Sequence, residues 1–230
     1  MHLFYTPDVA GAEHTLNEEE SKHCARVLRL AEGDTVHLAD GRGTLYTTRI
    51  ADANPKACKV RITDTVRDYG KRHRRLHLAV ALTKNMERYE WMLEKATEIG
   101  VEEITPLYGD HSERRTLKRE RAERVLIAAM KQSLRAQLPQ LHPLTSVAGF
   151  VEQTFGGRKL IAHCEPATKA PLTAALADCR DAVILIGPEG DFSPDEIAAA
   201  LQHGFTAVTL GDVRLRVETA ALMACCLFGG

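Results

Sequence analysis

The sequence lacks the features that mark membrane, secreted and zinc-finger proteins. No apolar run approaches the ~18 residues that cross a bilayer, and Met1-His2-Leu3-Phe4 does not begin a secretory signal. The cysteines form no C-x-x-C pair and have no ligand-like spacing with histidine; they are Cys24, Cys58, Cys164, Cys179, Cys225 and Cys226. These absences predict a reduced cytoplasmic protein with no membrane contact, no zinc site and no disulfide framework.

An excess of either charge is also lacking, because 30 Lys and Arg residues face 31 Asp and Glu residues. The distribution is nevertheless uneven, with a basic run at residues 71–75 and many basic residues between 114 and 135. Basic clusters on a neutral protein suggest that one face binds a polyanion. For residues 114–124 a solvated helix face is the alternative, since Glu113, Glu120 and Glu123 partly neutralise the run.

Neither of the common nucleotide-binding motifs, G-x-x-x-x-G-K-[ST] and G-x-G-x-x-G, occurs in the chain. Two other strand–glycine–helix corners are present instead. In the first, the apolar residues 183–186 meet Gly187-Pro188, and Ser193, Pro194 and Glu196 are typical of a helix start. Gly190 is the position expected to adopt a positive φ. In the second, residues 207–210 meet Gly211, and a helix is expected over 218–227.

Either corner alone is as consistent with an ordinary turn as with a binding site. Together they place free backbone N–H groups at the carboxyl ends of neighbouring parallel strands, where open α/β sheets bind ligands. Acidic residues are as prominent as basic ones in both corners, so a polyphosphate fits poorly. The pattern favours a neutral or cationic ligand held by main-chain groups.

Residues 1–70 alternate short β-type runs with turns, which predicts a small β-barrel with a hairpin turn at residues 40–43. A short helix is expected over 21–27. His23, Arg26 and Arg29 follow one another at intervals of three and should share one side of it. We interpret this side as a phosphate-contacting edge, with Arg42 on the hairpin as a second contact. The alternative is that these basic residues only offset the dipole of a helix end.

Residues 71–75 are predicted to be a linker, and residues 76–230 alternate strands with helices. Strands are expected at 76–82, 102–107 and 159–163, the second ended by Pro106, and helices at 85–99, 118–137, 146–154 and 172–176. This order predicts a mostly parallel sheet covered on both faces. His163-Cys164-Glu165 should form a third loop at the ligand end of that sheet. A thiol nucleophile at Cys164 is the alternative, and no nucleophile-elbow motif supports it.

The two corners, at 186–190 and at 210–220, resemble those of the small-subunit ribosomal RNA uridine-N3 methyltransferases, which are trefoil-knot (SPOUT) enzymes that use S-adenosylmethionine. The resemblance runs almost end to end, through His23 with residues 26–29, residues 95–101, and Gln132-Ser133. The sequence departs from the family pattern at Asp191, where a second Gly is usual. It also departs at Val217, where Thr is usual, and at Glu94, where Gln is usual.

The resemblance implies an α/β fold in which a PUA-like, RNA-binding β-barrel (1–70) precedes a knotted SPOUT domain (76–230). It also implies a homodimer that acts on 16S ribosomal RNA, free or in the assembled small subunit, with S-adenosylmethionine and no metal. The donor site would comprise His163, Cys164, Glu165, Ile186, Gly187, Pro188, Glu189, Gly190, Leu210, Gly211, Leu215, Arg216, Glu218, Thr219 and Ala220.

Methylation at N3 requires loss of the proton that neutral uridine carries there, either to a base or with help from a cation. Arg216 is the candidate for stabilising negative charge on the uracil, and Glu189 and Glu218 are unranked candidates for the proton acceptor. An internal Arg216–Glu218 ion pair is the structural alternative. Two other functions remain open: a non-catalytic RNA-binding or ribosome assembly factor, and a methyltransferase of the same fold that modifies another position in ribosomal RNA.

Overall fold

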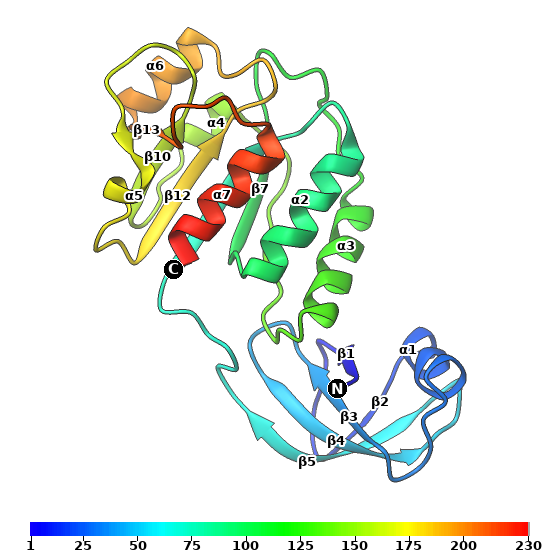
Figure 1. Cartoon of the computed structure of the whole chain (residues 1–230). Coiled ribbons are helices and arrows are strands. Elements are labelled where there is room, and N and C mark those ends of the chain that lie inside the picture. The colour runs from blue at the N-terminus through cyan, green and yellow to red at the C-terminus, as the bar shows by residue number, and fades with distance from the viewer. Residues whose placement is uncertain (230) are drawn as a thin grey trace. The chain divides into compact units, whose positions relative to one another are not determined.

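The computed structural model describes residues 1–229, which fold into two compact units (Figure 1). The first unit contains Met1–Lys71 and Met130–Leu138, and the second contains Arg72–Ala129 and the chain from Pro139 onward. Across the described residues, no helix has both the length and the apolar character that a bilayer span requires.

The first unit is built on a five-stranded sheet whose strands lie in the order β1-β3-β4-β5-β2. β1 is parallel to β3, and the other neighbours are antiparallel. Its elements are β1 (Leu3–Tyr5), β2 (Glu13–Thr15), α1 (Glu18–Lys22), the π-helical turn η1 (His23–Val27), β3 (Thr35–Ala39), β4 (Leu45–Asp52) and β5 (Lys59–Val66). The predicted barrel is instead a curled, open sheet. Among the described residues β1 pairs with β3 and β2 pairs with β5, so β1 and β2 are its two edge strands.

The predicted hairpin turn joins β3 to β4. The Asp40 carboxylate accepts hydrogen bonds from the backbone N–H groups of Arg42 (2.8 Å) and Thr44 (3.0 Å), while Gly41 has a positive φ of 74°. A short acidic side chain that closes a turn in this way fixes the register of the two strands. The core beneath the sheet contains Phe4, Leu16, Cys24, Val36, Leu38, Ile50, Cys58 and Val60.

Helix α3 (Arg119–Gln132) is shorter than predicted, because it ends at Gln132 and not near Pro139. Leu134 takes a left-handed φ of 56°, and the Arg135 N–H donates back to the Met130 carbonyl oxygen (3.0 Å), which closes the last turn. The next residues pair with the hairpin turn, with Gly43 N–H donating to Ala136 O and Leu138 N–H to Gly41 O. The expected division into residues 1–70 and 76–230 omits this return of 130–138 to the first unit.

Met130 and Ala136 are part of a second apolar cluster of the first unit. There they pack with Leu3, Ala39 and Leu45, all buried. The N-terminal unit therefore takes part of its core from a segment that follows it by about sixty residues in the sequence.

The second unit is built on an entirely parallel sheet in the order β11-β13-β10-β12-β6-β7-β8, with β9 also paired to β7. Its strands are β6 (Arg75–Ala81), β7 (Glu103–Tyr108), β8 (Gln140–Leu141), β9 (Thr145–Ser146), β10 (Arg158–Ala162), β11 (Ala170–Pro171), β12 (Asp181–Ile186) and β13 (Thr206–Thr209). Besides α3, its helices are α2 (Met86–Ile99), α4 (Val147–Val151), α5 (Leu172–Ala175), α6 (Pro194–Gln202) and α7 (Val217–Gly229). The predicted α/β class, with a mostly parallel sheet in this unit, is confirmed.

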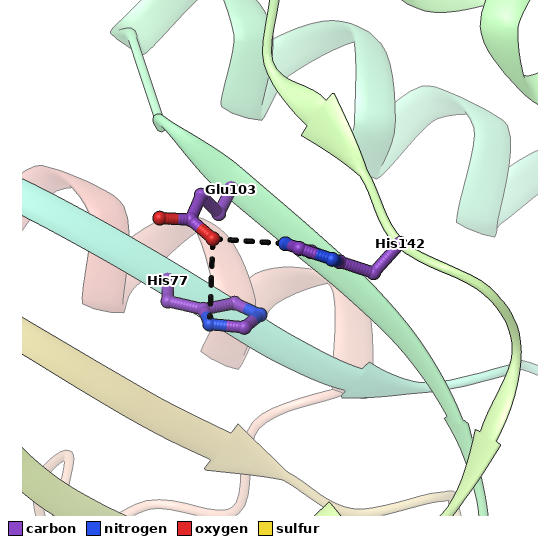
Figure 2. Close-up of side chains that lie close together, drawn as sticks. All are labelled: His77, Glu103 and His142. Atoms are coloured by element: carbon purple, nitrogen blue, oxygen red, sulfur yellow. Dashed lines mark hydrogen bonds and ion pairs between the residues drawn. The ribbon is translucent and has the colours of Figure 1, made fainter. Parts of the chain in front are cut away.

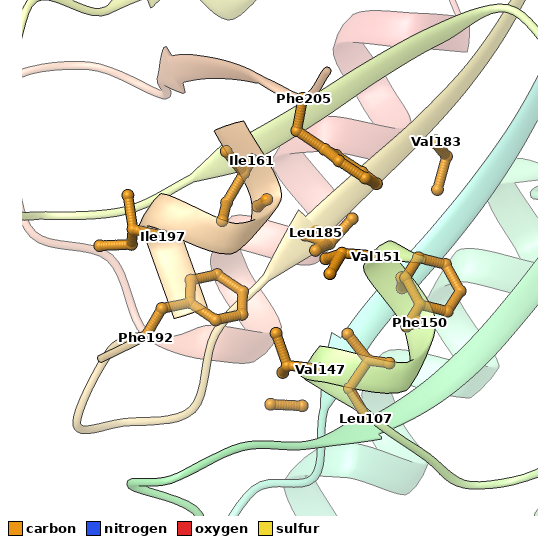
Figure 3. Packing of buried hydrophobic residues seen from close by; sticks show 13 residues of the cluster. Leu107, Val147, Phe150, Val151, Ile161, Val183, Leu185, Phe192, Ile197 and Phe205 are labelled. Carbon is orange, nitrogen blue, oxygen red and sulfur yellow. The ribbon is translucent and has the colours of Figure 1, made fainter. Parts of the chain in front are cut away.

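Helices cover both faces of this sheet because its strands are apolar at successive positions. On one face, alternate residues of β12 such as Val183 and Leu185 pack with side chains of α4 and α6, as Figure 3 shows. On the other face, α7 packs against β6, β12 and α2. The central strands are therefore buried on both sides, and the exposed chemistry is concentrated in the loops at the strand ends.

Two details differ from the sequence-based expectation. Pro106 lies inside β7 and does not end it, opposite Val80 of β6. Residues 71–75 are not a simple linker, since the Arg74 guanidinium donates to the carbonyl oxygens of Leu176 (2.7 Å) and Cys179 (2.8 Å). This part of the basic run therefore serves the structure of the second unit.

Candidate active site

Three neighbouring strands, β13, β10 and β12, end at one edge of the parallel sheet. The loops that follow them enclose a cavity of about 850 Å³. Residues of three segments, 162–165, 186–191 and 208–218, supply nearly all of its lining. This volume is typical of a pocket for one small organic ligand, and its place at the carboxyl ends of parallel strands is where such folds bind ligands.

The first corner is held by helix capping and by Asp191. Ser193 caps α6 in a complete capping box with Glu196, as the sequence predicts. The positive φ falls on Asp191 (65°) and not on Gly190, which corrects the expectation for that glycine. Asp and Asn tolerate this conformation better than most residues. The Asp191 carboxylate accepts hydrogen bonds from the N–H groups of Cys164 (2.6 Å) and Phe192 (2.9 Å).

Gly187 and Gly190 are needed for close packing. A Cβ atom on Gly187 would lie 3.1 Å from the buried ring of Phe192, and one on Gly190 would lie 2.9 Å from the Cβ of His111. The His111 Nδ1 atom also lies 3.0 Å from the Gly190 carbonyl oxygen. The small residues of this corner therefore let the loop lie close to its neighbours.

The loop after β10 carries His163, which is 7% exposed and lines the cavity. Neither ring nitrogen of His163 has a hydrogen-bond partner among the described residues. Burial, together with the nearby Lys169 ammonium, lowers the pKa of His163 below its usual 6.5, which favours the neutral imidazole. Lys169 also fixes the loop by donating to the carbonyl oxygens of His163 (2.8 Å) and Glu165 (3.0 Å).

The second corner follows β13. Gly211 has a φ of 132°, which other residues avoid, and Thr209 Oγ1 bonds both the N–H and the carbonyl oxygen of Gly211. Leu215 is half-buried, Arg216 is exposed, and α7 begins at Val217. The backbone of Arg216 accepts a hydrogen bond from the Ala220 N–H (2.8 Å) and so joins the first turn of the helix.

The three charged candidates have different surroundings. Glu189 Oε1 accepts a hydrogen bond from the Lys84 N–H (2.9 Å). Glu218 is 8% exposed and pairs with Arg88 of α2, with 3.8 Å between Nε and Oε1, and not with Arg216. Within residues 1–229 the Arg216 guanidinium has no hydrogen-bond or ion-pair partner. Both carboxylates are therefore engaged, while Arg216 is an available cation on the cavity lining.

The structure brings every predicted donor-site residue to this cavity except Thr219, which lies exposed on α7. Sequence reasoning missed Asp191 as a site residue, as well as Arg88 and Lys169. Asp191 was visible as a departure from the family pattern. Arg88 and Lys169 gave no such signal, because only packing brings α2 and the 165–169 loop to the corners.

The predicted phosphate-contacting residues lie in the first unit. His23, Arg26 and Arg29 are exposed on and just after η1, where the chain forms a π-helical turn in place of the expected α-helix. Arg29 has a left-handed φ of 57°. Arg42 is exposed on the hairpin turn and donates to the Pro7 carbonyl oxygen (2.9 Å). These exposed side chains are candidates for an RNA contact.

A parallel sheet with a cavity between the loops at its carboxyl edge defines an α/β ligand-binding domain of the kind that enzymes use for small organic molecules. Comparison with known proteins gives the family. The model of the RNA methyltransferase domain matches residues 71–229, and that of the RNA methyltransferase PUA domain matches residues 16–63. The chain belongs to the RNA methyltransferase family.

Relatives with this arrangement include the ribosomal RNA small subunit methyltransferase E of Mycobacterium bovis, which is 31% identical over 96% of this chain and 88% of its own length. Among solved structures, a probable rRNA-methyltransferase from Porphyromonas gingivalis is 41% identical with a TM-score of 0.89, covering 98% of this chain and 96% of that one. A ribosomal RNA small subunit methyltransferase E from Neisseria gonorrhoeae bound to S-adenosyl methionine is 28% identical, with a TM-score of 0.86 and coverage of 98% and 95%.

Proposed function

We propose that this protein transfers a methyl group from S-adenosylmethionine to N3 of a uridine in small-subunit (16S) ribosomal RNA. The similar proteins named above support the substrate class, and one of those structures carries the donor. The observation that carries the proposal is the cavity between the three loops at the carboxyl edge of the sheet, with the Arg216 guanidinium, unpartnered within the described chain, on its lining.

The residues present fit this donor. Its adenosine needs main-chain hydrogen bonds and apolar walls, which the loops 186–190 and 210–216 offer together with Ile186, Leu210 and Leu215. His163 lines the cavity, but both of its ring nitrogens are buried from solvent, so the polar contacts to the donor are assigned to the loop backbone. The charged residues that line the cavity are of both signs: Arg88, Lys169, Arg214 and Arg216 beside Glu165, Glu189, Asp191, Asp212 and Glu218. This balance fits a polyphosphate poorly and agrees with a ligand that is neutral or cationic.

When bound, S-adenosylmethionine supplies an electrophilic methyl group on a sulfonium centre. The protein must present a uracil that has lost its N3 proton. We assign Arg216 to stabilising the negative charge that then develops on the uracil oxygens, because its guanidinium lines the cavity without a partner. The uracil N3 edge is paired in a duplex, so the target nucleotide must be unpaired or flipped.

Glu189 and Glu218 differ as candidates for accepting the uridine N3 proton. Glu189 is committed to the Lys84 N–H, and we propose that it positions the first corner. Glu218 is nearly buried beside Arg88, and we propose that this pair orients the start of α7, from which Arg216 extends. Of the two, Glu218 is the stronger candidate for accepting the proton, since its partner is 3.8 Å away and leaves the carboxylate oxygens able to bind a further group.

We further propose that His23, Arg26, Arg29 and Arg42 contact RNA phosphates, since they are exposed hydrogen-bond donors on the unit that matches a PUA domain. The expected substrate is 16S ribosomal RNA, free or in the assembled small subunit, and the expected place of action is the cytoplasm.

A knotted backbone and a homodimer complete the proposal. The chain leaves β13, crosses back past β10 and β12, and places α7 against β6, which supports threading through its own sheet. Val213, on a cavity loop, is 73% exposed, as expected of a side chain that a second copy would cover. Light scattering of the purified protein measures the dimer directly.

The deciding experiment combines donor binding with nucleoside mapping. Calorimetry should detect saturable binding of S-adenosylmethionine, and 16S RNA from a deletion strain should lack one 3-methyluridine that the purified protein restores. If no donor binds at high micromolar concentration, the protein is a non-catalytic RNA-binding factor. If a different modified nucleoside disappears, the fold is right and the target position is wrong.

A further inference from the structure

A cluster of metal-ligating side chains lies in the second unit away from the cavity. It consists of His77 near the start of β6, Glu103 at the start of β7 and His142 just after β8 (Figure 2). We propose that these three residues form a binding site for a divalent transition-metal ion such as Zn²⁺. The proposal goes beyond methyl transfer and does not depend on it.

Sheet register brings the three residues together. His77 and Glu103 are direct partners in the β6–β7 ladder, and Glu103 is the partner of Gln140, two residues before His142. The His142 N–H donates to the Ile104 carbonyl oxygen (2.8 Å), which extends the ladder to the third ligand. A site on the backbone of three hydrogen-bonded strands is held more rigidly than one on loops.

The ligand atoms already converge. One ligand atom from each residue lies within 4.8 Å of the others. Glu103 Oε2 is 2.8 Å from His142 Nε2 and 3.9 Å from His77 Nδ1, and Figure 2 shows it directed at both rings. Ligands about 2.1 Å from a zinc ion are separated by roughly 3.4 Å in a tetrahedral site. The His77 and His142 rings are stacked, with centroids 5.0 Å apart and 29° between their planes, so coordination requires the partly exposed His142 ring to turn until both lone pairs meet the ion.

The surroundings support coordination by His77. Its other nitrogen, Nε2, lies 2.7 Å from Thr105 Oγ1. If Nε2 carries the proton and donates to this hydroxyl, Nδ1 presents its lone pair to the metal, an arrangement common around metal-ligating histidines. The rings of Phe150 and Phe155 pack edge-on against His77, with centroids at 5.5 and 5.7 Å, and form an apolar wall.

The site is partly open. The side chains of Glu103 and His142 are 24% and 27% exposed, which leaves a route for an ion and for one or two water ligands. The other Glu103 oxygen, Oε1, accepts from Arg75 (2.9 Å), so the carboxylate is oriented with Oε2 toward the histidines. Two imidazoles and one carboxylate suit zinc and its neighbours and disfavour Mg²⁺ and Ca²⁺, which prefer oxygen ligands.

The ion would be remote from methyl transfer. His77 lies opposite Val183 on β12, three residues before Ile186 at the cavity, a separation of about 10 Å along the strand. It would cross-link β6, β7 and the segment after β8 at the opposite end of the sheet. The cysteine spacing gave no sign of this site, because its ligands are brought together by strand register and include no thiol.

Titration of the full-length protein with Zn²⁺ against a competing chelator tests the site. We expect one ion per chain, a concentration-dependent rise in melting temperature, and no competition from a large excess of Mg²⁺. The His142→Gln variant should lose on the order of 100-fold in Zn²⁺ affinity, and Thr105→Val about tenfold through the lost support of His77. His203→Gln removes an exposed histidine elsewhere and should bind zinc as the unchanged protein does.

Co²⁺ gives a direct reading of the ligands in the unchanged protein, so the result does not depend on how the variants fold. Visible d–d bands without a sulfur-to-metal charge-transfer band support the His77–Glu103–His142 site. A charge-transfer band would place the metal on a thiol such as the exposed Cys164, and this would overturn the proposal. Absence of saturable Zn²⁺ binding, or equal affinity in His142→Gln, would overturn it as well.

Discussion

The Asp191 carboxylate accepts a hydrogen bond from the Cys164 N–H, with 2.6 Å between nitrogen and Oδ2, and so ties together the loops after β10 and β12. Its other oxygen accepts from the Phe192 N–H (2.9 Å). The residue that departs from the family pattern is therefore the one that joins two walls of the cavity. A second glycine would permit the same backbone turn but would leave both N–H groups without this acceptor.

Replacing Asp191 should weaken donor binding through this connection. Asp191→Ala removes both acceptors and places a Cβ residue without a compensating side chain at φ 65°, so we expect a loss of about 2 kcal/mol in unfolding free energy. Asp191→Asn keeps one acceptor oxygen and should lose less. Calorimetry with S-adenosylmethionine and thermal unfolding measure the two effects. Equal donor affinity in all three proteins would show that the connection does not shape the cavity.

Arg216 should contribute more to the turnover rate than to the affinity for the methyl donor. Arg216→Ala is expected to lower kcat by about 10²–10³-fold with a much smaller change in donor affinity, because its guanidinium acts on charge that develops in the transition state. Arg216→Lys should recover part of the loss. Single-turnover methylation and donor calorimetry supply the two numbers. Equal losses in turnover and donor affinity would instead give Arg216 a structural role.

Glu218→Gln should loosen the orientation of the first turn of α7, because it leaves Arg88 without its anionic partner. If the Arg88–Glu218 pair only orients the helix, Arg88→Ala will reproduce the effect of Glu218→Gln on methylation. If Glu218 accepts the uridine proton, its loss alone will shift the pH dependence of the rate. The pH–rate profiles of the two variants distinguish these roles.

Arg26 and Arg29 should contribute to RNA affinity through phosphates. The double variant Arg26→Ala/Arg29→Ala is expected to weaken binding of 16S RNA and to reduce the slope of log K against log salt by about one per lost contact. Arg61→Ala is the matched control, because Arg61 is already paired with Glu13 at 3.0 Å in the same unit. Filter binding over a range of salt concentrations gives the slopes. An unchanged slope in the double variant would exclude this edge as the RNA contact.

Gly187 should tolerate no side chain, because a side chain there would press on the protein core and not primarily on the ligand. In Gly187→Ala the new methyl group lies 3.1 Å from the Phe192 ring, which is buried in the core beside α4 and α6. We expect a loss of about 1–3 kcal/mol in stability together with weaker donor binding. Denaturant unfolding with and without S-adenosylmethionine measures both. Unchanged unfolding with lost binding would mean that the methyl group blocks the ligand directly.

The sequence predicted the features that local chemistry specifies. The Ser193 capping box starts α6 as predicted, because Glu196, its partner, lies only three residues away. The loops around the cavity could be located because each follows a short apolar strand.

The remaining features depend on distant partners. The end of α3 at Gln132 depends on pairing between Leu138 and Gly41. Likewise, the pairing of Glu218 with Arg88 requires α7 to lie beside α2. The trio His77, Glu103 and His142 is spread over 66 residue numbers and meets only through strand register. No periodicity or motif encodes these contacts in a single sequence.

The return of residues 130–138 restricts how this gene can be divided. A fragment ending at Lys71 would lack Met130 and Ala136 and would expose Leu3, Ala39 and Leu45 to water. Its N-terminal module is thus encoded in two separated pieces, the second of them inside the coding region of the methyltransferase domain. Recombination that exchanges only one continuous stretch cannot transplant the module intact, so both halves of the protein are expected to be inherited together.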